Sequence, residues 1–224
     1  MKLQLIYTLI LAVAFIIIFV LGEVILKLFK VKAEITRKTI HLCSGLLTML
    51  FPVMLNNHWL VLILCGSFFV ILIVSQFLGL LNSIHGVERI TYGSMLFPIA
   101  VYVSYFIAEK MQNWLYFFIP IQIMAISDTM AAIIGQKFPY KSFKLLNHTK
   151  TISGSIAFLA SAFTITTGLM IYFTFGSYIT IIIIALIIAS ITTLVEAISH
   201  KGIDNLSIPL TALLLIFLIQ QILH

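Results

Sequence analysis

Long apolar runs separated by short polar connections dominate this chain of 224 residues. A helix needs about 20 mostly apolar residues to cross the hydrocarbon core of a bilayer. Because a backbone in lipid must satisfy its own hydrogen bonds, such runs predict helices rather than open sheets. Eight runs qualify as candidate spans, with ends placed to within a few residues: 3–28, 38–55, 59–78, 93–109, 113–135, 154–175, 177–197 and 207–223.

The scarcity of charge supports the same class. Only 9% of the residues are charged and 62% are hydrophobic, whereas a soluble domain carries about a quarter charged residues. The basic residues are scattered between apolar runs and form no stripe for nucleic acid. We therefore predict an all-α, polytopic transmembrane helical bundle, one membrane-embedded domain over residues 1–224, with no nucleic-acid partner. Assembly into a homo-oligomer is left open.

The basic residues also predict an orientation. With eight spans, the odd-numbered connections lie on one side of the membrane, and they contain eleven of the thirteen lysines and arginines. The opposite side has only Lys2 and Lys110. Basic residues mark the cytoplasmic side, so both termini are predicted to be non-cytoplasmic. Most acids and histidines follow the basic side, which predicts an active site that faces the cytoplasm. The compactness of the chain favours a bacterial inner (cell) membrane.

Asp128 is the most informative single residue, because it lies inside an apolar run. A carboxylate in a membrane helix costs about 2.5–3.5 kcal/mol, so a partner or ligand must offset it. Helical spacing places Asp128 on one face with Ala125, Ala132 and Gly135, and these small residues allow another helix or a ligand to approach closely. A functional carboxylate is the favoured interpretation. An interhelical salt bridge with a lysine or arginine is the alternative.

A second polar group begins the second run. Arg37, His41, Ser44 and Thr48 recur at helical spacing and form one stripe. Arginine offers a planar fork for phosphate, and Lys38 adds a point charge. Basic anchors are common at helix ends, so the arginine and lysine alone have a simpler explanation. For His41, a ligand contact and a satisfied core histidine are equally good interpretations.

A third group precedes the run at 154–175. Lys150, Thr151, Ser153 and Gly154 combine a cation with the free amides of a helix start, an arrangement that suits an anion. The pattern is not a Walker A loop, and a simple serine N-cap is the alternative.

A fourth group surrounds the connection before the last run. Glu196, Asp204 and Asn205 would face the same compartment, and two or three carboxylates can hold Mg²⁺ together with substrate phosphates. A solvated turn explains Asp204 and Asn205 about as well, whereas Glu196 lies nearer the apolar helix.

The chain thus has acidic residues that can bind a metal, basic residues that can bind phosphate, and access to lipid. Enzymes that transfer a phosphoryl or nucleotidyl group to a membrane lipid use these features. The blocks that contain these residues resemble the dolichol kinase, phytol kinase and CTP-dependent diacylglycerol kinase family. They occur in the same order and span nearly the whole chain. The blocks are RKTIH at 37–41, SDTMAAIIGQKF at 127–138, KTISGS at 150–155 and EAISHKGIDNLSIPL at 196–210.

This resemblance implies a membrane enzyme that moves the γ-phosphate of CTP onto a lipid alcohol of the polyprenol, phytol or diacylglycerol type, with Mg²⁺. We expect the lipid substrate, CTP and the bilayer as its partners. The hypothesis assigns roles to the following residues: catalysis to Asp128, His41 and Lys150; nucleotide binding to Arg37, Lys38, Thr151, Ser153, Gly154 and Asn205; and metal binding to Asp128, Glu196 and Asp204.

Two other functions fit parts of the pattern. Phosphatidate cytidylyltransferases, which are related to this family, share the DTxA and KTxxGS patterns. They differ in a C-terminal segment rich in glycine and histidine, where this chain has GIDNLSIP, and the RKTIH block also favours the kinase. A small transporter is a weaker alternative, because transporters place their sites at the midplane between repeats.

Overall fold

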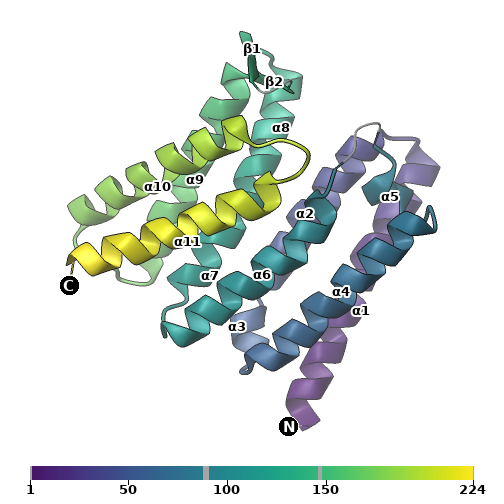
Figure 1. The fold of residues 1–224 in the computed structure, drawn as a ribbon, viewed down its shortest axis with the longest axis horizontal. Coiled ribbons are helices and arrows are strands. Elements are labelled where there is room, and N and C mark those ends of the chain that lie inside the picture. The colour runs from purple at the N-terminus through teal and green to yellow at the C-terminus, as the bar shows by residue number, and fades with distance from the viewer. Residues whose placement is uncertain (1, 88–90, 146–147, 224) are drawn as a thin grey trace.

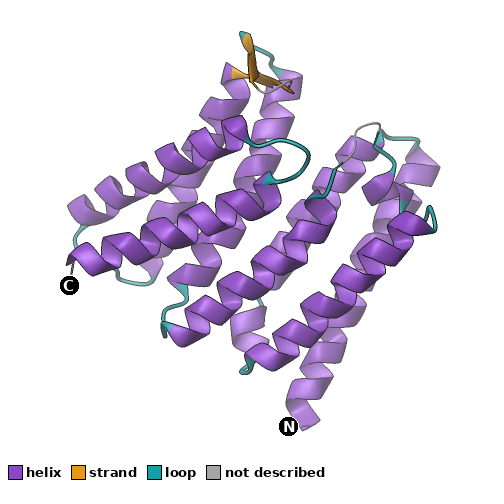
Figure 2. Cartoon of the chain, viewed as in Figure 1, coloured by secondary structure: helices purple, strands orange, loops and turns teal. Residues whose placement is uncertain are grey.

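The computed structural model describes residues 2–87, 91–145 and 148–223. This part of the chain is almost entirely helical, apart from one short β-hairpin (Figure 2). The predicted all-α bundle is confirmed. Arg89, which we placed on the basic side, lies outside the described residues.

All eight predicted runs correspond to helical segments in the described residues. Six helices are long and apolar enough to cross a membrane. The second and fourth runs fall outside this group: the second is interrupted at Met49–Leu50, and the fourth is short and ends in Glu109 and Lys110. The segments are α1 (Lys2–Phe29), α2 (Ala33–Thr48) with α3 (Phe51–Met54), α4 (His58–Phe77), α6 (Gly93–Lys110), α7 (Leu115–Gln122) with the π-helix η1 (Ile123–Ser127) and α8 (Asp128–Lys137), α9 (Ile152–Tyr172), α10 (Tyr178–Ile198) and α11 (Asp204–Leu223).

The segments alternate in direction, so the connections collect at the two ends of the bundle. The hairpin, the short helix α5 (Asn82–His85) and the α10–α11 connection lie at one end, and both chain ends lie at the other (Figure 1). This is the arrangement that the sequence predicts for the basic connections. Below, the end of the bundle that carries the hairpin is called the hairpin end.

The fifth segment forms the centre of the bundle. In its most apolar stretch 67% of the residues are buried, against 22% in α1. It packs against α2, α6, α9 and α11. The π-helix η1 adds a wider turn immediately before Asp128. Such turns often occur at functional sites, and here the turn sets the direction of the residue that carries the intramembrane carboxylate.

Small residues allow the central segment to approach its neighbours. A Cβ on Gly45 of α2 would lie 2.2 Å from the Cβ of Ala125, and one on Gly154 of α9 would lie 2.9 Å from the carbonyl oxygen of Ala131. These distances are too short for a side chain. Of the small face predicted around Asp128, Ala125 packs closely against α2 and Gly135 against the start of α9, whereas Ala132 lines the polar cavity described below.

The polar ends of the segments differ from the sequence prediction. The polar connection between the predicted runs 113–135 and 154–175 contains an antiparallel hairpin of β1 (Ser142–Leu145) and β2 (His148–Thr151), with Ser142 opposite Thr151. The last helix starts at Asp204 rather than 207, because an acid is stabilised in the first turn of a helix. An apolar run therefore predicts the part of a helix that crosses lipid, but not the polar turns at its ends.

Candidate active site

A polar cavity of about 240 Å³ lies at the hairpin end, between α2, α8, the start of α9 and the α10–α11 connection. Its walls contain four carboxylates and several cations. Residues that line it include Glu34, Lys38, Asp128, Ala132, Gly135, Thr149, Lys150, Thr151, Gly154, Glu196, Ser199, His200, Lys201 and Asp204.

Asp128 forms an ion pair with Lys38 across the gap between the central segment and α2. Their side chains are 7% and 13% exposed. This is the interhelical salt bridge that the sequence left open as an alternative. However, the pair lies in the wall of the polar cavity, where both groups can meet a ligand. The ion pair and a functional role are therefore compatible.

A second ion pair faces the same cavity. The ammonium group of Lys150 pairs with the carboxylate of Glu196, and it also donates to the carbonyl oxygen of Glu196 at 2.8 Å. The other carboxylate oxygen of Glu196 is buried and has no hydrogen-bond partner among the described residues. A buried acceptor without a donor is costly, so this oxygen is suited to receive a ligand or cation.

Thr151, rather than a serine, caps α9. Its hydroxyl oxygen accepts a hydrogen bond from the amide of Gly154, with an N–O distance of 3.1 Å. Ser153 lies outside the cavity wall, where its hydroxyl donates to Thr151 at 3.3 Å and accepts the amide of Tyr140 at 3.3 Å. The Gly154 amide, which the sequence assigned to an anion, is already used by the cap. Lys150 and Thr151 are the parts of this block that face the cavity.

Asp204 and Asn205 point in different directions. Asp204 lines the polar cavity, whereas the amide of Asn205 donates to the carbonyl of Gly93 at 2.7 Å. Gly202 has a φ of +81°, and a Cβ there would lie 2.4 Å from the Gly93 nitrogen. The α10–α11 connection is therefore pressed against the start of α6, which holds Asp204 in position.

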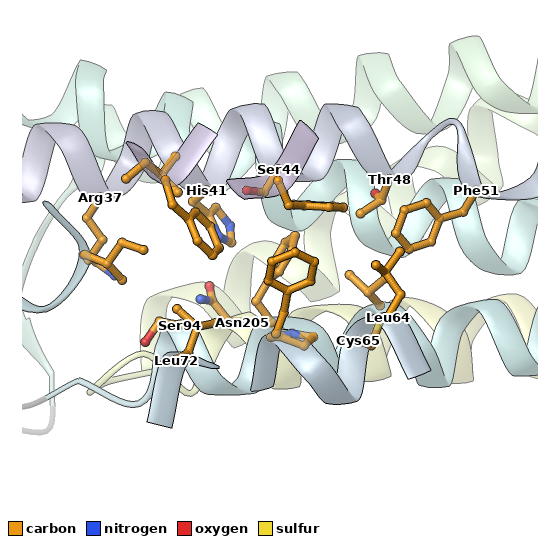
Figure 3. A pocket seen from close by; sticks show the side chains of 18 residues that line it. Arg37, His41, Ser44, Thr48, Phe51, Leu64, Cys65, Leu72, Ser94 and Asn205 are labelled. Carbon is orange, nitrogen blue, oxygen red and sulfur yellow. The ribbon is translucent and has the colours of Figure 1, made fainter. Parts of the chain in front are cut away.

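A second cavity, of about 70 Å³, lies between α1, α2, α4 and α6 and is mostly apolar (Figure 3). Arg37, His41 and Asn205 gather at one end of it. Arg37 pairs with Glu34 at 2.7 Å. The His41 ring lies 5.0 Å from that of Phe97, and its Nε2 lies 3.4 Å from the carbonyl oxygen of Met124.

The predicted site residues therefore divide between two cavities. The division follows the face of each helix. The polar cavity is lined by Lys38, Asp128, Lys150, Thr151, Gly154, Glu196 and Asp204; the apolar cavity by Arg37, His41 and Asn205; and neither by Ser153.

The donor set fits a metal that shares its coordination with a substrate. In the described part of the chain, no group of three His, Cys, Asp or Glu side chains is close enough to hold an ion by itself. Mg²⁺ commonly binds one or two carboxylates together with substrate phosphates. The unpartnered oxygen of Glu196 beside Asp128 and Asp204 suits that mode.

Several residues of the polar cavity were not predicted. His200 and Lys201 lie within the C-terminal block, so their sequence position could have suggested them. Glu34 and Thr149 gave no such signal, because their place depends on the start of α2 and on the hairpin.

A phytol kinase from Synechocystis sp. is 27% identical over 197 residues, covering 87% of this chain and 83% of the relative. No family model matches the chain, and no solved structure matches it significantly. The relative confirms the resemblance to the phytol and dolichol kinase family. It supports a lipid-alcohol kinase, and thus a phosphotransferase, in a multi-pass membrane protein.

Proposed function

We propose that this protein transfers the γ-phosphate of CTP to a membrane lipid alcohol. The observation that supports it best is the position of α2 between two cavities of opposite character. One face of this helix presents Lys38 to a polar cavity with four carboxylates, and an adjacent face presents His41 to an apolar cavity. A kinase that transfers phosphate from a nucleotide to a lipid alcohol needs these two environments next to each other. CTP as the donor rests on the resemblance of the four sequence blocks.

The polar cavity is assigned to the nucleotide phosphates and the metal. Lys38 and Lys150 would exchange part of their pairing with Asp128 and Glu196 for the phosphate oxygens. Asp128, Glu196 and Asp204 would hold Mg²⁺, which neutralises charge on the transferring group when bound. The two ion pairs keep each charge compensated before the substrate arrives, which avoids the cost of an isolated buried charge.

His41 is assigned to the acceptor hydroxyl. A carbonyl oxygen can only accept, so the Nε2 that faces Met124 carries the ring proton. In the neutral ring Nδ1 is then the acceptor, and it can receive the hydrogen bond of an alcohol. Met124 precedes Asp128 by four residues in the central segment, so the His41 ring lies about one helical turn from the residue that carries this carboxylate. The hydroxyl would therefore sit at the junction of the two cavities.

The proposed step breaks one bond and forms another. The alcohol oxygen attacks the γ-phosphorus, the bond from that phosphorus to the β–γ bridging oxygen breaks, and CDP leaves. The hydroxyl proton passes to His41 and then to solvent. Positioning and charge neutralisation account for most of the acceleration in such transfers. Because the lysine-rich connections mark the cytoplasmic side, we place the polar cavity towards cytosolic CTP, in a bacterial cell membrane.

Donor and position of attack can be tested together. Purified protein in lipid vesicles with Mg²⁺ is given CTP that is labelled separately at the α and γ phosphates, with polyprenol, phytol, diacylglycerol or phosphatidate. We expect γ label in the lipid product. Label from the α-phosphate with release of pyrophosphate would identify a cytidylyltransferase. Lack of transfer from either position would reject both activities.

A second arm tests the nucleotide. The same assay with γ-labelled ATP, GTP and UTP measures whether CTP is preferred. A preference for ATP would leave the kinase assignment intact and reject CTP as the donor.

A further inference from the structure

The apolar cavity has the form of a channel that follows α2 into the bundle. Five residues of α2 line it on one face: Arg37, Ile40, His41, Ser44 and Thr48. From Arg37 to Thr48 is eleven residues, or about 16 Å along a helix. The cavity thus extends from the Arg37 end of α2 deep between α1, α2, α4 and α6 (Figure 3).

Aromatic rings close the deep end. The centroid of the Phe15 ring lies 6.0 Å from that of Phe51 and 5.0 Å from that of Phe68. Leu64 and Cys65 of α4 complete this part of the wall (Figure 3). The channel therefore has a polar entrance and an apolar floor, and a molecule of matching polarity would bind in one direction only.

The cavity is narrow for its length. Its volume of about 70 Å³ is less than a third of that of the polar cavity, although it extends along most of α2. A space of this shape accommodates one chain and has no room for a second chain beside it. This feature separates single-chain alcohols from diacylglycerol.

Unpartnered polar atoms in the wall point to an occupant with a polar head. The hydroxyl of Ser44, which is 5% exposed, has no hydrogen-bond partner among the described residues, and neither has the Nε of Arg37. Both residues line the cavity. Well-packed interiors rarely leave such atoms unsatisfied. A bound hydroxyl at the Arg37 end would satisfy the Nε of Arg37, which packing alone does not.

We infer that this channel binds the apolar chain of the lipid alcohol, one chain at a time, and that its aromatic floor limits the chain length. The inference rests on the proposed function, because it places the acceptor hydroxyl at His41. It adds the location of the chain, a preference for single-chain alcohols over diacylglycerol, and the residues that set the length.

Photolabelling without nucleotide tests the location independently of catalysis. A long-chain alcohol with a diazirine at its far end is bound to the protein in detergent and irradiated, and the labelled peptides are mapped by mass spectrometry. We expect labelling of Phe51 and of the α4 segment 64–68. Unlabelled alcohols should compete, with affinity that rises roughly fourfold per added methylene until the floor is reached. Diacylglycerol should compete at least tenfold more weakly.

Two variants of opposite effect test the length limit. Ser44→Phe should fill the middle of the channel and weaken competition by long alcohols more than tenfold, with little effect on short ones. Leu64→Ala should deepen the channel and move the preferred length upwards. The matched controls are Leu46→Phe on the outer face of α2 and Ile63→Ala on α4, which are 44% and 61% exposed in the native protein.

The outcomes distinguish a failure of the channel from a failure of the proposed kinase activity. Labels spread over lipid-facing helices, equal competition by diacylglycerol, or an unchanged length preference in the Leu64→Ala variant would overturn the channel. Labelling of the floor in a protein that shows no γ-phosphate transfer would keep the channel and reject the kinase.

Discussion

The two cavities beside α2 differ in what stabilises their walls. The polar cavity contains charges that compensate each other in pairs, Lys38 with Asp128 and Lys150 with Glu196. The apolar cavity is enclosed by packed rings and aliphatic side chains, with a few polar groups at one end. Electrostatics therefore organises the first cavity and packing organises the second. Changes in the first should affect chemistry, and changes in the second should affect the choice of acceptor.

Neighbouring residues of α2 belong to different cavities. Arg37 lines the apolar cavity and Lys38 the polar one. Successive residues of an α-helix are separated by about 100° around the axis, so one position along the chain is enough to change the surroundings of a charge. α2 can thus align the lipid hydroxyl with the nucleotide if it holds both sets of residues rigidly.

Asp128→Asn should produce the largest effect. The change removes the carboxylate charge with little change of shape, and we expect activity to fall on the order of 10³-fold, the loss found when a group that stabilises charge in the transition state is removed. Turnover of CTP and lipid alcohol in vesicles measures it. Binding of long-chain alcohols to the apolar cavity should stay within about twofold, since affinity there depends on buried apolar area.

Glu109→Gln is the matched control, because Glu109 lies at the opposite end of the bundle, where it accepts the amide of His58 at 3.1 Å. This variant should keep near-native turnover. Near-native turnover in the Asp128→Asn protein would remove Asp128 from the mechanism.

Changes to the pair Lys150–Glu196 should have a slightly smaller effect, but they separate a structural role from a catalytic one. Lys150→Met leaves the buried Glu196 carboxylate without its partner, which should destabilise the protein by about 3 kcal/mol and abolish most activity. The double variant Lys150→Met with Glu196→Gln removes both charges and should recover most of the thermal stability in detergent. Activity should not return, because phosphate and metal binding need the charges themselves. Recovery of activity together with stability would show that the pair is only structural.

Much of the bundle follows from the sequence, because apolar length decides where a helix can cross lipid. Runs such as 59–78 and 177–197 agree with α4 and α10 to within one residue at each end. The polar connections could not be predicted in the same way. The hairpin depends on pairing between Ser142 and Thr151, which apolar length does not report.

The sequence predicted which residue types form the site, but it did not predict the direction in which each side chain points. The sequence identified Asp128, Lys150 and Glu196, whose charges are unusual beside apolar runs, and these three share one cavity. It grouped Arg37 and Asn205 with them. Their actual directions depend on the contact of Asn205 with Gly93 and on the packing of α2 against the π-helix, which arise only from tertiary contacts.

Gly45→Ala should produce a moderate effect on both cavities at once. A Cβ at Gly45 would lie 2.2 Å from the Cβ of Ala125, so α2 must move away from the central segment. Overpacking of this kind costs about 1–3 kcal/mol. Thermal unfolding in detergent, CTP turnover and alcohol binding should all be impaired. Gly66→Ala is the control, since no atom lies within 4 Å of its added Cβ, and it should be neutral or stabilising by up to about 1 kcal/mol.

The smallest expected effect concerns His85, which follows Ile84 of the apolar cavity wall in the sequence. Burial lowers the pKa of its imidazole from the ordinary value of 6.5, although the carboxylate of Glu23 opposes this change. Its Nε2 lies 3.0 Å from the hydroxyl of Ser75. The unfolded chain therefore binds a proton at a higher pH than the folded protein, so stability should decrease as the pH falls below 6.5.

The pH dependence of thermal unfolding measures this effect, with His85→Gln as the variant that lacks the titrating group. We expect a small loss of stability between pH 6.5 and the lowered pKa in the native protein, and a flatter profile in the variant. Because Ile84 and Leu72, which flank this histidine, line the apolar cavity, alcohol binding should weaken over the same pH range. An identical pH profile for both proteins would show that protonation of His85 is not coupled to the apolar half. Any pH dependence of alcohol binding would then arise from groups other than His85.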